Sequence, residues 1–456
     1  MVDDVVFYSS LLVCLSLGGY YKKIDDLEMK RNYGAGLGLL VACLVCGHNV
    51  YHSVFIVWGN IIIIKCCDKR YIHQMSLAYT WIYLIYLHVT LRSVYAIWMH
   101  QTIALRLVGL AFEVYMAAKP QKNKPTSSKQ SMEKYTGIEP DVSSVDPSAV
   151  DIITYSYFFV GLHRGPYFRW KLFEDHFYAP FGVLGDCRII TEHKLKKALV
   201  CYLGYLLLKL QFSPDAYYDD EFYKSFGSES RYLYNVPQLA MYFLHYQTIM
   251  LLCTSVCTES GFGVYPVKCQ PVPGHGPTAG GSLLKLASTT TDVALQQEYN
   301  FSMLKCFDNE KILFGPKMRD TIRSWDMSTR YWFSTYMYKQ FFKTNKEIRS
   351  ACSFAAWCVW RGPSLQHLIM AATLWVYVQL ESEYSELYDA NDTLCFPWNL
   401  GFSLMRLFCL LYLTPCFILN DTATVFRYYN SIYWVYHIIL LVLLVAVAVC
   451  YKIKRT

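Results

Sequence analysis

A cluster of charged and aromatic residues at 319–339 is the first part of the sequence whose side chains could carry out chemistry. It reads RDTIRSWDMSTRYWFSTYMYK and places Asp326 directly after Trp325. Arg323 and Arg330 lie three and four residues from Asp326, so on one helix both guanidinium groups could reach its carboxylate. The pattern fits an ion-pair cluster at a membrane surface as well as it fits a reactive site.

A second group of candidate residues surrounds a Gly-Pro turn in GLHRGPYFRW at 161–170. Arg164 and Arg169 could hold an anionic lipid headgroup or a phosphate of coenzyme A, because a guanidinium group forms paired hydrogen bonds with phosphate oxygens. The same residues could instead form a turn at the membrane boundary, from which both arginines extend their charges into water. The segment alone does not separate these interpretations.

The third candidate is an arginine inside an apolar run, WCVWRGPSLQHLIMAATLW at 357–375. A charge at membrane depth is costly, so Arg361 needs a partner or a cavity and is by default a candidate functional residue. His367 follows six residues later and could act as a base near neutral pH. On an ideal helix the two side chains would lie on different faces, but Gly362 and Pro363 are expected to break the helix.

Taken in chain order, these segments resemble the signature of the membrane-bound O-acyltransferases, and in particular that of the lysophosphatidylinositol acyltransferase branch. The resemblance covers nearly the whole chain. It is carried by ITYSYFFVGLHRGPYFRW at 153–170, GFGVYP at 261–266, RDTIRSWDM at 319–327, WRGPSLQH at 360–367 and DTATVFRYYNSIY at 421–433.

The resemblance implies a multi-pass protein of the endoplasmic reticulum membrane with a buried tunnel. Acyl-CoA would enter from the cytosolic side and a lysophospholipid from the bilayer, among the membrane lipids. No metal or cofactor is implied, since acyl-CoA is a substrate. A family Asn, or in some members Asp, pairs with a His that acts as general base on the lysophospholipid hydroxyl. The implied substrate-binding positions are Gly165, Pro166, Phe168, Arg169, Arg323 and Trp325.

Two departures from the family pattern fall on the catalytic pair. Asp326 occupies the Asn position, and Arg361 occupies the position of the catalytic His. An arginine stays protonated in a protein and cannot serve as a base, and loss of a general base costs roughly 10²–10⁴-fold in rate. Asp326 and Arg361 could instead form an ion pair, and His367 could take over as the base.

Two functions therefore stay open. One is acyl transfer from acyl-CoA to a lysophospholipid, with lysophosphatidylinositol as the expected acceptor. The other is a lipid-binding or regulatory membrane protein that has lost catalysis. A transporter or channel is a third possibility that the charges within the membrane allow. Whether the chain is an enzyme is left open by the substitutions at the catalytic pair.

Composition indicates which elements must position these residues. The chain has 456 residues, of which 54% are apolar and only 17% are charged. Soluble domains carry about a quarter charged residues, so we expect an all-α polytopic membrane protein. About ten or eleven transmembrane helices are predicted. The apolar windows are 5–21, 33–47, 49–65, 73–98, 102–118, 197–211, 236–257, 350–380, 398–419 and 431–451.

The remaining segments are expected to connect these helices within a single membrane domain, residues 1–456. The polar segment 119–150 is predicted to be a flexible loop, and the Gly- and Pro-rich segment 258–300 an aqueous loop. Residues 151–162 and 300–348 are predicted to be re-entrant or interfacial. The net charge of +7 lies in short clusters beside apolar segments, which does not indicate a nucleic-acid partner. The oligomeric state is not predicted.

Overall fold

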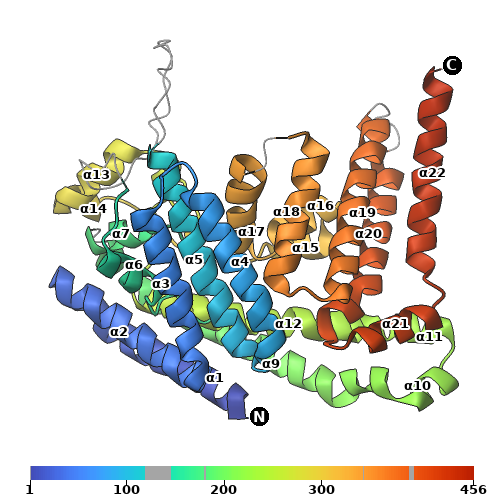
Figure 1. The fold of residues 1–456 in the computed structure, drawn as a ribbon, viewed down its shortest axis with the longest axis horizontal. Coiled ribbons are helices and arrows are strands. Elements are labelled where there is room, and N and C mark those ends of the chain that lie inside the picture. The colour runs from blue at the N-terminus through green and yellow to red at the C-terminus, as the bar shows by residue number, and fades with distance from the viewer. Residues whose placement is uncertain (1, 119–144, 179–180, 342–343, 390–394, 456) are drawn as a thin grey trace. The chain divides into compact units, whose positions relative to one another are not determined.

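The computed structural model is built almost entirely of helices (Figure 1). It describes residues 2–118, 145–178, 181–341, 344–389 and 395–455. The strands in this described part are β1 (Tyr265–Pro266) and β2 (Tyr299–Asn300), which pair antiparallel with Tyr265 opposite Asn300. The predicted all-α class is confirmed.

The chain divides into two compact units, each assembled from segments that are distant in sequence. Unit 1 comprises Met1–Ala198, Ile249–Cys306 and Asp326–Tyr336, and unit 2 comprises Leu199–Thr248, Phe307–Trp325 and Met337–Thr456. The boundary between Trp325 and Asp326 passes through one of the candidate sites. The expectation of a single membrane domain stays a prediction.

Unit 1 is organised around α5 (Val94–Ala118), which is buried along most of its length. Helices α3 (Val50–Cys66) and α4 (Ile72–Thr90) lie beside α5 (Figure 1). Helix α1 (Val2–Lys22) packs on α2 (Leu27–Cys46), and α2 packs on the short helix α6 (Ala149–Ser156). This bundle forms the support for the buried segment that follows α6.

Arg106 of α5 fixes the start of that segment. Its guanidinium group is fully buried and donates hydrogen bonds to the carbonyl oxygens of four residues. The acceptors are Tyr155 (3.1 Å), Ser156 (3.2 Å), Phe158 (2.8 Å) and Val160. These carbonyls belong to the end of α6 and to irregular backbone, where ladder or helix hydrogen bonds are incomplete, although the Tyr155 carbonyl also accepts from the backbone N–H of Phe158 at 3.4 Å. The cation therefore replaces the missing backbone donors.

Glu113, seven residues further along α5, fixes the other end of the segment. Its carboxylate accepts hydrogen bonds from the backbone N–H groups of Trp170 (3.0 Å) and Lys171 (3.4 Å). These amides open α7 (Trp170–Tyr178), where an anion complements the positive end of the helix. The hydroxyl of Tyr336 donates a third hydrogen bond at 3.3 Å. Opposite charges on one helix thus hold both ends of residues 157–169.

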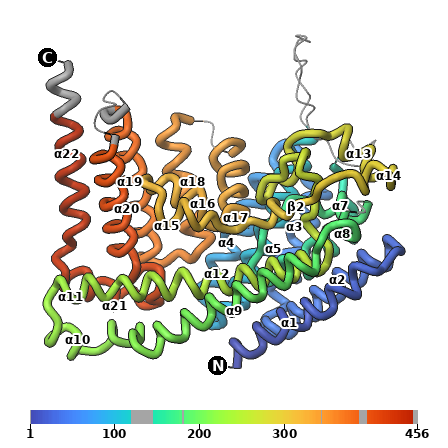
Figure 2. Tube along the Cα trace, turned by 180° about the vertical axis from the view of Figure 1, so that it is seen from behind, coloured from blue at the N-terminus to red at the C-terminus, as the bar shows by residue number. Residues whose placement is uncertain are grey.

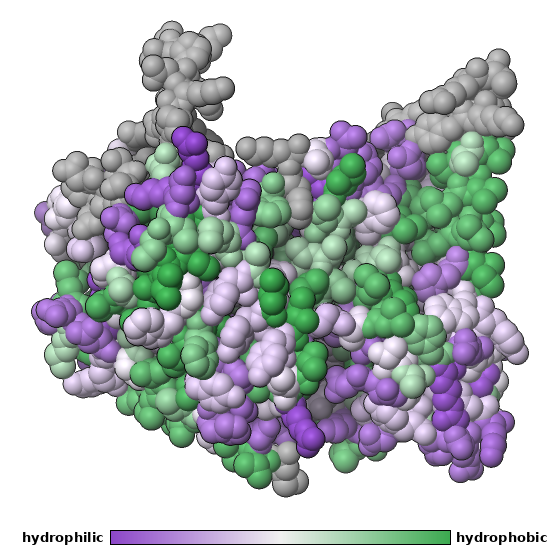
Figure 3. Space-filling view, in the orientation of Figure 1, coloured by the Kyte–Doolittle hydropathy of each residue, from purple (hydrophilic) through white to green (hydrophobic). Residues whose placement is uncertain are grey.

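Unit 2 contains the C-terminal helices. They are α18 (Lys346–Arg361), α19 (Leu365–Asp389), α20 (Cys395–Ile418), α21 (Thr422–Ser431) and α22 (Val435–Arg455). Figures 1 and 2 show α22 beside α19 and α20, with which it packs. Figure 3 shows a hydrophobic surface over α22. Its exposed apolar side chains include Ile438, Leu441, Val442 and Val445, as expected for contact with lipid.

Unit 2 repeats the way in which unit 1 holds irregular backbone. Arg406 of α20 donates to the carbonyl oxygens of Ile312 and Leu313 (2.8 Å to the latter), in the last turn of α15 (Asn309–Phe314). Glu381 of α19 accepts from the backbone N–H of Met318, the first residue of α16 (Met318–Ser324), and from that of the next residue. Arginine caps carbonyls and glutamate caps amides in both units.

The count of membrane helices stays a prediction. Five helices in the described part are long and apolar enough to cross a membrane, or six if the bent pair α21–α22 is one span. One predicted boundary is wrong, because the break between α4 and α5 lies at Leu91–Ser93 and not between 98 and 102. The window 350–380 is also not one helix. Gly362, at φ 142°, and Pro363 separate α18 from α19, as these residues predicted.

The predicted loops are more structured than their composition indicates. Of the segment 119–150, residues 119–144 lie outside the described part. The segment 258–300 is not a loop throughout, because it contains α13 (Gly281–Thr289) and α14 (Thr291–Leu295). Past its Gly- and Pro-rich part, GSLLKLAST holds apolar residues at helical spacing. Residues 157–160, predicted to be interfacial or re-entrant, are buried non-helical backbone.

We expect Arg106→Leu to lower the free energy of unfolding by about 3–5 kcal/mol, because it leaves buried carbonyls without a donor. Arg106→Lys should retain part of this stability. Arg92→Leu is the control, since Arg92 is exposed in the same unit and should change stability by less than about 0.5 kcal/mol. Thermal unfolding of the purified chain in detergent measures all three. Equal melting temperatures for Arg106→Leu and Arg92→Leu would contradict the assigned role.

Candidate active site

Asp326 caps the start of α17 (Met327–Trp332) in unit 1. Its backbone is left-handed, with φ 39° and ψ 63°, a conformation that Asn and Asp adopt more readily than other residues with a side chain. The carboxylate accepts from the backbone N–H of Thr329 and from the hydroxyl of Ser328, each at 3.4 Å. Only 6% of Asp326 is exposed. The backbone therefore favours either of the residue types that the family signature has at this position.

The single helix proposed to bring Arg323 and Arg330 to Asp326 is not formed. Residues 323–330 do not form one helix, because α16 ends at Ser324 and α17 begins at Met327. Arg323 is exposed in unit 2, so the helical spacing that would bring it to Asp326 is not formed. The backbone N–H of Arg330 donates to the carbonyl oxygen of Asp326 at 2.9 Å, as the first turn of α17 requires.

The Gly-Pro segment lies against the start of α17. Gly165 has φ 118° and is followed by a cis peptide bond to Pro166. The backbone N–H of Tyr167 donates to the hydroxyl oxygen of Ser328 at 3.1 Å, and that hydroxyl donates to the Asp326 carboxylate. Ser328 therefore links Asp326 to Tyr167, directly after two of the predicted substrate-binding residues.

The hydrogen bonds that join Asp326, Ser328 and Tyr167 continue through Tyr336 to Glu113. The hydroxyl groups of Tyr167 and Tyr336 lie 3.3 Å apart, and Tyr336 donates to Glu113. Phe168 is fully buried, with its ring centroid 4.5 Å from that of Phe262. Phe168 is thus part of the wall of unit 1, where it also lies 4.8 Å from the guanidinium carbon of Arg106.

The two arginines of the Gly-Pro segment differ in their surroundings. Arg164 is buried, donates to the side-chain oxygen of Gln101 at 2.7 Å and lies over the ring of Trp98 at 4.9 Å. It does not extend into water, so the membrane-boundary interpretation is wrong for this residue. Arg169 is half-buried, and its binding of a substrate anion stays a prediction.

Cys306 also lies beside the start of α17 in unit 1. Its carbonyl oxygen accepts from the backbone N–H of Met327 at 2.9 Å. Burial, together with the nearby carboxylate of Asp326, raises the pKa of the Cys306 thiol well above its ordinary value. The thiol stays protonated at neutral pH, which makes Cys306 a poor nucleophile.

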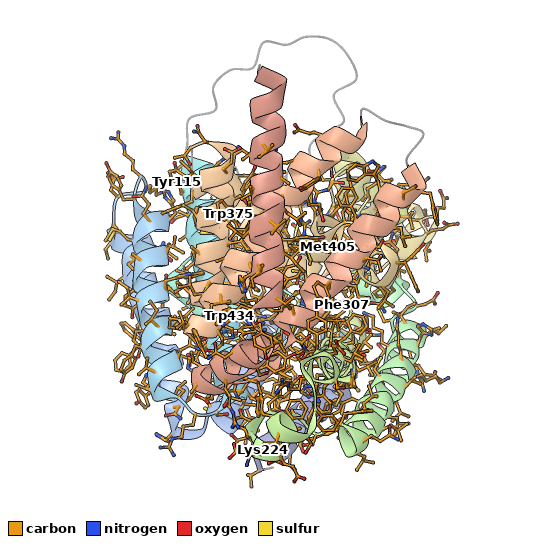
Figure 4. The ribbon with its side chains drawn as sticks, turned by 90° about the vertical axis from the view of Figure 1, so that its right-hand side faces the viewer. Tyr115, Lys224, Phe307, Trp375, Met405 and Trp434 are labelled. Atoms are coloured by element: carbon orange, nitrogen blue, oxygen red, sulfur yellow. The ribbon has the colours of Figure 1, made fainter. Side chains whose placement is uncertain are left out.

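The remaining candidates belong to unit 2. Trp325 stacks on Tyr246 with ring centroids 5.2 Å apart and on Tyr242 at 6.0 Å. Phe307, labelled in Figure 4, packs edge-on against Trp325 at 5.0 Å. Trp325 is therefore a wall of an aromatic cluster, which is compatible with contact to an apolar part of a substrate.

Arg361 is the last residue of α18 and lies against the same aromatic cluster. Its guanidinium group donates to the hydroxyl of Tyr242 at 3.3 Å. The guanidinium carbon lies 6.0 Å from the ring centroid of Trp357 and 5.8 Å from that of Phe417. Among the described residues of unit 2, no carboxylate forms an ion pair with Arg361. The proposed pair with Asp326, a residue of unit 1, stays a prediction.

His367 lies in the first turn of α19. Its Nδ1 is 3.0 Å from the carbonyl oxygen of Gly362 and 2.8 Å from the hydroxyl oxygen of Ser364. A carbonyl can only accept, so when Nδ1 bonds to Gly362 it carries the proton, and Nε2 is then the basic nitrogen of the neutral ring. This tautomer is suited to accept a proton, which fits the proposed replacement of the missing family His.

Sequence reasoning missed the residues that position the site. Arg106 and Glu113 were not selected, although each is a charged residue inside the apolar window 102–118 and could have been found by that signal. Ser328 and Tyr167 gave no such signal. Their hydrogen bond joins residues 161 positions apart, and nothing in the local sequence indicates it.

Comparison with known proteins decides the family. A sequence model described as the membrane-bound O-acyltransferase family matches residues 75–420. The chain belongs to the membrane-bound O-acyltransferase family. The match includes the Gly-Pro segment and Asp326 in unit 1 and Arg361 and His367 in unit 2, so the candidate residues of each unit lie within the family's region of similarity. The multi-pass membrane character predicted from composition is confirmed with it.

Individual relatives extend this similarity to almost the full chain. The membrane-bound acylglycerophosphatidylinositol O-acyltransferase frj of Drosophila melanogaster is 27% identical over 96% of this chain and 90% of its own length. The human membrane-bound acylglycerophosphatidylinositol O-acyltransferase MBOAT7 is 27% identical over 96% and 92%. Lysophospholipid acyltransferase 5 of Rattus norvegicus is 23% identical over 95% and 85%.

We expect Asp326→Asn to preserve the fold, because asparagine tolerates the left-handed backbone and can still accept from Thr329. Asp326→Val should lower the free energy of unfolding by about 2 kcal/mol, since a β-branched residue is strained at this φ and the helix loses its cap. Thermal unfolding in detergent compares the two variants. A valine variant as stable as the asparagine variant would show that the cap and the left-handed backbone contribute little.

Proposed function

We propose that this family member is a lysophospholipid O-acyltransferase that transfers an acyl chain from acyl-CoA to lysophosphatidylinositol. The observation that carries the proposal is the similarity to two relatives named as acylglycerophosphatidylinositol O-acyltransferases, which extends over 96% of this chain. As part of the same proposal, the reaction takes place in the endoplasmic reticulum membrane, with acyl-CoA arriving from the cytosolic side.

The proposed reaction is attack of a lysophospholipid hydroxyl on the thioester carbonyl. The new carbon–oxygen bond forms, the carbon–sulfur bond breaks, and the hydroxyl proton passes through a base to the departing thiolate of coenzyme A. Arg361 cannot take that proton. We assign this role to His367, whose Nε2 is the basic nitrogen when Nδ1 donates to the carbonyl of Gly362. Asp326, held by Ser328 and Thr329, would orient the acceptor.

The proposal assigns the substrates to the residues already described. Gly165, Pro166 and Phe168 would form the wall beside Asp326, and Arg169 would bind an anionic group of a substrate. Trp325 would contact an apolar part of the acyl chain. Arg323 is exposed, so we assign it a contact with the polar part of a substrate and not with its acyl chain.

A second function is supported by one specific observation. Arg361 stands at the position of the family's catalytic His, where no proton acceptor can be formed from it. A protein that binds acyl-CoA and lysophospholipid without turnover, or that regulates an active relative, would keep the fold and lose only this base.

The natural chain should acylate lysophosphatidylinositol in isolated membranes supplied with acyl-CoA. His367→Ala should lower the rate by roughly 10²–10⁴-fold if His367 is the base. His193→Ala is the control, because His193 is an exposed histidine outside the candidate site. Formation of labelled phosphatidylinositol, normalised to the amount of protein, measures each rate.

The double variant Asp326→Asn with Arg361→His separates the two functions. A natural chain at background, together with activity in the double variant, would contradict the acyltransferase proposal and support the non-catalytic one. A natural chain as fast as the double variant would contradict the non-catalytic one. Equal rates for His367→Ala and the natural chain would remove His367 from the mechanism.

A further inference from the structure

Arg361 carries a positive charge for which the described part of unit 2 supplies no carboxylate partner. Its hydrogen bond to the Tyr242 hydroxyl leaves most of its N–H donors unused, since a guanidinium group has several. Its Nε is buried and has no hydrogen-bond partner among the described residues. No carboxylate of the described part of unit 2 forms an ion pair with it. The side chain as a whole is half-buried, so its charge is only partly hydrated and a further partner would stabilise it.

Other arginines of unit 2 show the usual solutions. Arg406 is buried and donates to two carbonyl oxygens of α15 and to the hydroxyl of Thr321. Arg231 donates to the carbonyl oxygens of Tyr223 and Ser431, each at 3.0 Å. Arg427 forms an ion pair with Asp220. Backbone carbonyls or a carboxylate accept from the terminal nitrogens of each of them, whereas Arg361 has neither within the described part of the unit. The buried Nε does not distinguish Arg361, because the Nε atoms of Arg231 and Arg406 also have no hydrogen-bond partner among the described residues.

The surroundings of Arg361 are aromatic. The rings of Trp357 and Phe417 lie 6.0 Å and 5.8 Å from its guanidinium carbon. Tyr242 stacks on Phe417 at 5.4 Å and on Trp325 at 6.0 Å. Such rings hold a cation by its attraction to their faces, but they supply little hydrogen bonding. They also keep the local dielectric low, which strengthens the attraction of the cation for an anion.

We propose that Arg361 binds a phosphate group of a substrate, and so acts as a binding residue in place of the family's base. This inference rests on the proposed function for the choice of ligand. A planar guanidinium group can form two parallel hydrogen bonds to phosphate oxygens. The surrounding rings would contact the glycerol or acyl part of the same molecule. The phosphate belongs either to the lysophospholipid headgroup or to coenzyme A, which share this chemistry.

Binding to the full-length chain in lipid nanodiscs tests the proposal without requiring turnover. The probe is fluorescent lysophosphatidylinositol, compared with a monoacylglycerol that has the same labelled chain but no phosphate. The variants are Arg361→Gln and Arg361→Lys. Arg427→Gln is the matched control, because it removes an exposed arginine of the same unit whose charge Asp220 already neutralises.

We expect Arg361→Gln to weaken binding of lysophosphatidylinositol by about tenfold or more while leaving the monoacylglycerol unchanged. The affinity of Arg361→Lys for lysophosphatidylinositol should lie between those of the natural chain and Arg361→Gln, because lysine keeps the charge but cannot form the paired hydrogen bonds. Arg427→Gln should match the natural chain. An equal loss for both ligands in Arg361→Gln would indicate damaged packing and overturn the proposal.

Competition identifies the source of the phosphate. If unlabelled lysophosphatidylinositol displaces the probe from the natural chain and coenzyme A does not, the lipid supplies it. If the natural chain and Arg361→Gln bind the lysophosphatidylinositol probe equally well, but Arg361→Gln binds labelled acyl-CoA about tenfold more weakly, acyl-CoA supplies the phosphate. If Arg361→Gln weakens binding of neither lysophosphatidylinositol nor acyl-CoA, the proposal is overturned.

An internal counter-ion would also overturn it. If Asp326 neutralised Arg361, the natural chain would show no Arg361-dependent phosphate binding, and Asp326→Asn would create it. The outcome for the proposed function is separate. Arg361-dependent phosphate binding without acylation in membranes would retain this inference and reject the proposed function. Acylation that does not depend on Arg361 would retain the proposed function and reject this inference.

Discussion

The satisfaction of irregular backbone by buried charges is the constraint on which this structure depends. A chain within a membrane cannot leave N–H and C=O groups without partners, and helices satisfy theirs internally. The segment at 157–169 and the short helices around 309–324 are not long helices, so their backbone groups need partners from elsewhere. Arg106 and Glu113 supply them in unit 1.

The same arrangement recurs in unit 2, where Arg406 donates hydrogen bonds to backbone carbonyl oxygens and Glu381 accepts hydrogen bonds from backbone N–H groups. In each unit the two side chains come from long helices, and the held segment carries candidate functional residues. A guanidinium group suits carbonyls because it offers several donors in one plane, and a carboxylate suits the open end of a helix. These four charges therefore act on the site through the backbone, without being part of its chemistry.

The candidate residues of unit 1 lie in polar surroundings, and those of unit 2 lie in aromatic ones. In unit 1, Asp326 is tied by Ser328 to the backbone of Tyr167, so small changes there alter hydrogen bonding. In unit 2, Arg361 lies among aromatic rings and has a hydrogen bond to the Tyr242 hydroxyl. The left-handed backbone at Asp326 further restricts its replacement to a few residue types.

Much of the fold followed from the sequence, because apolar windows of membrane length and the Gly362–Pro363 break have direct structural consequences. Only those candidate residues that belong to a local sequence motif could be predicted. Asp326, Arg361 and His367 stood out by their position in the motifs. The break before Asp326 did not, since Ser, Asp and Thr in RSWDMSTR are all possible helix caps and the segment does not show which of them begins a helix. The contact between Tyr167 and Ser328 depends on tertiary folding, which spacing cannot reveal.

The end of α18 has a consequence for how this family can change. A helix ends with partial negative charge on its last carbonyls, so a cationic side chain there is favoured by about 0.3–1 kcal/mol whatever its chemistry. Arg361 occupies that place, and a protonated histidine would be favoured in the same way. The local fold therefore does not distinguish a residue that can exchange a proton from one that cannot. The dipole contribution to stability at this helix end therefore does not oppose an exchange between arginine and protonated histidine.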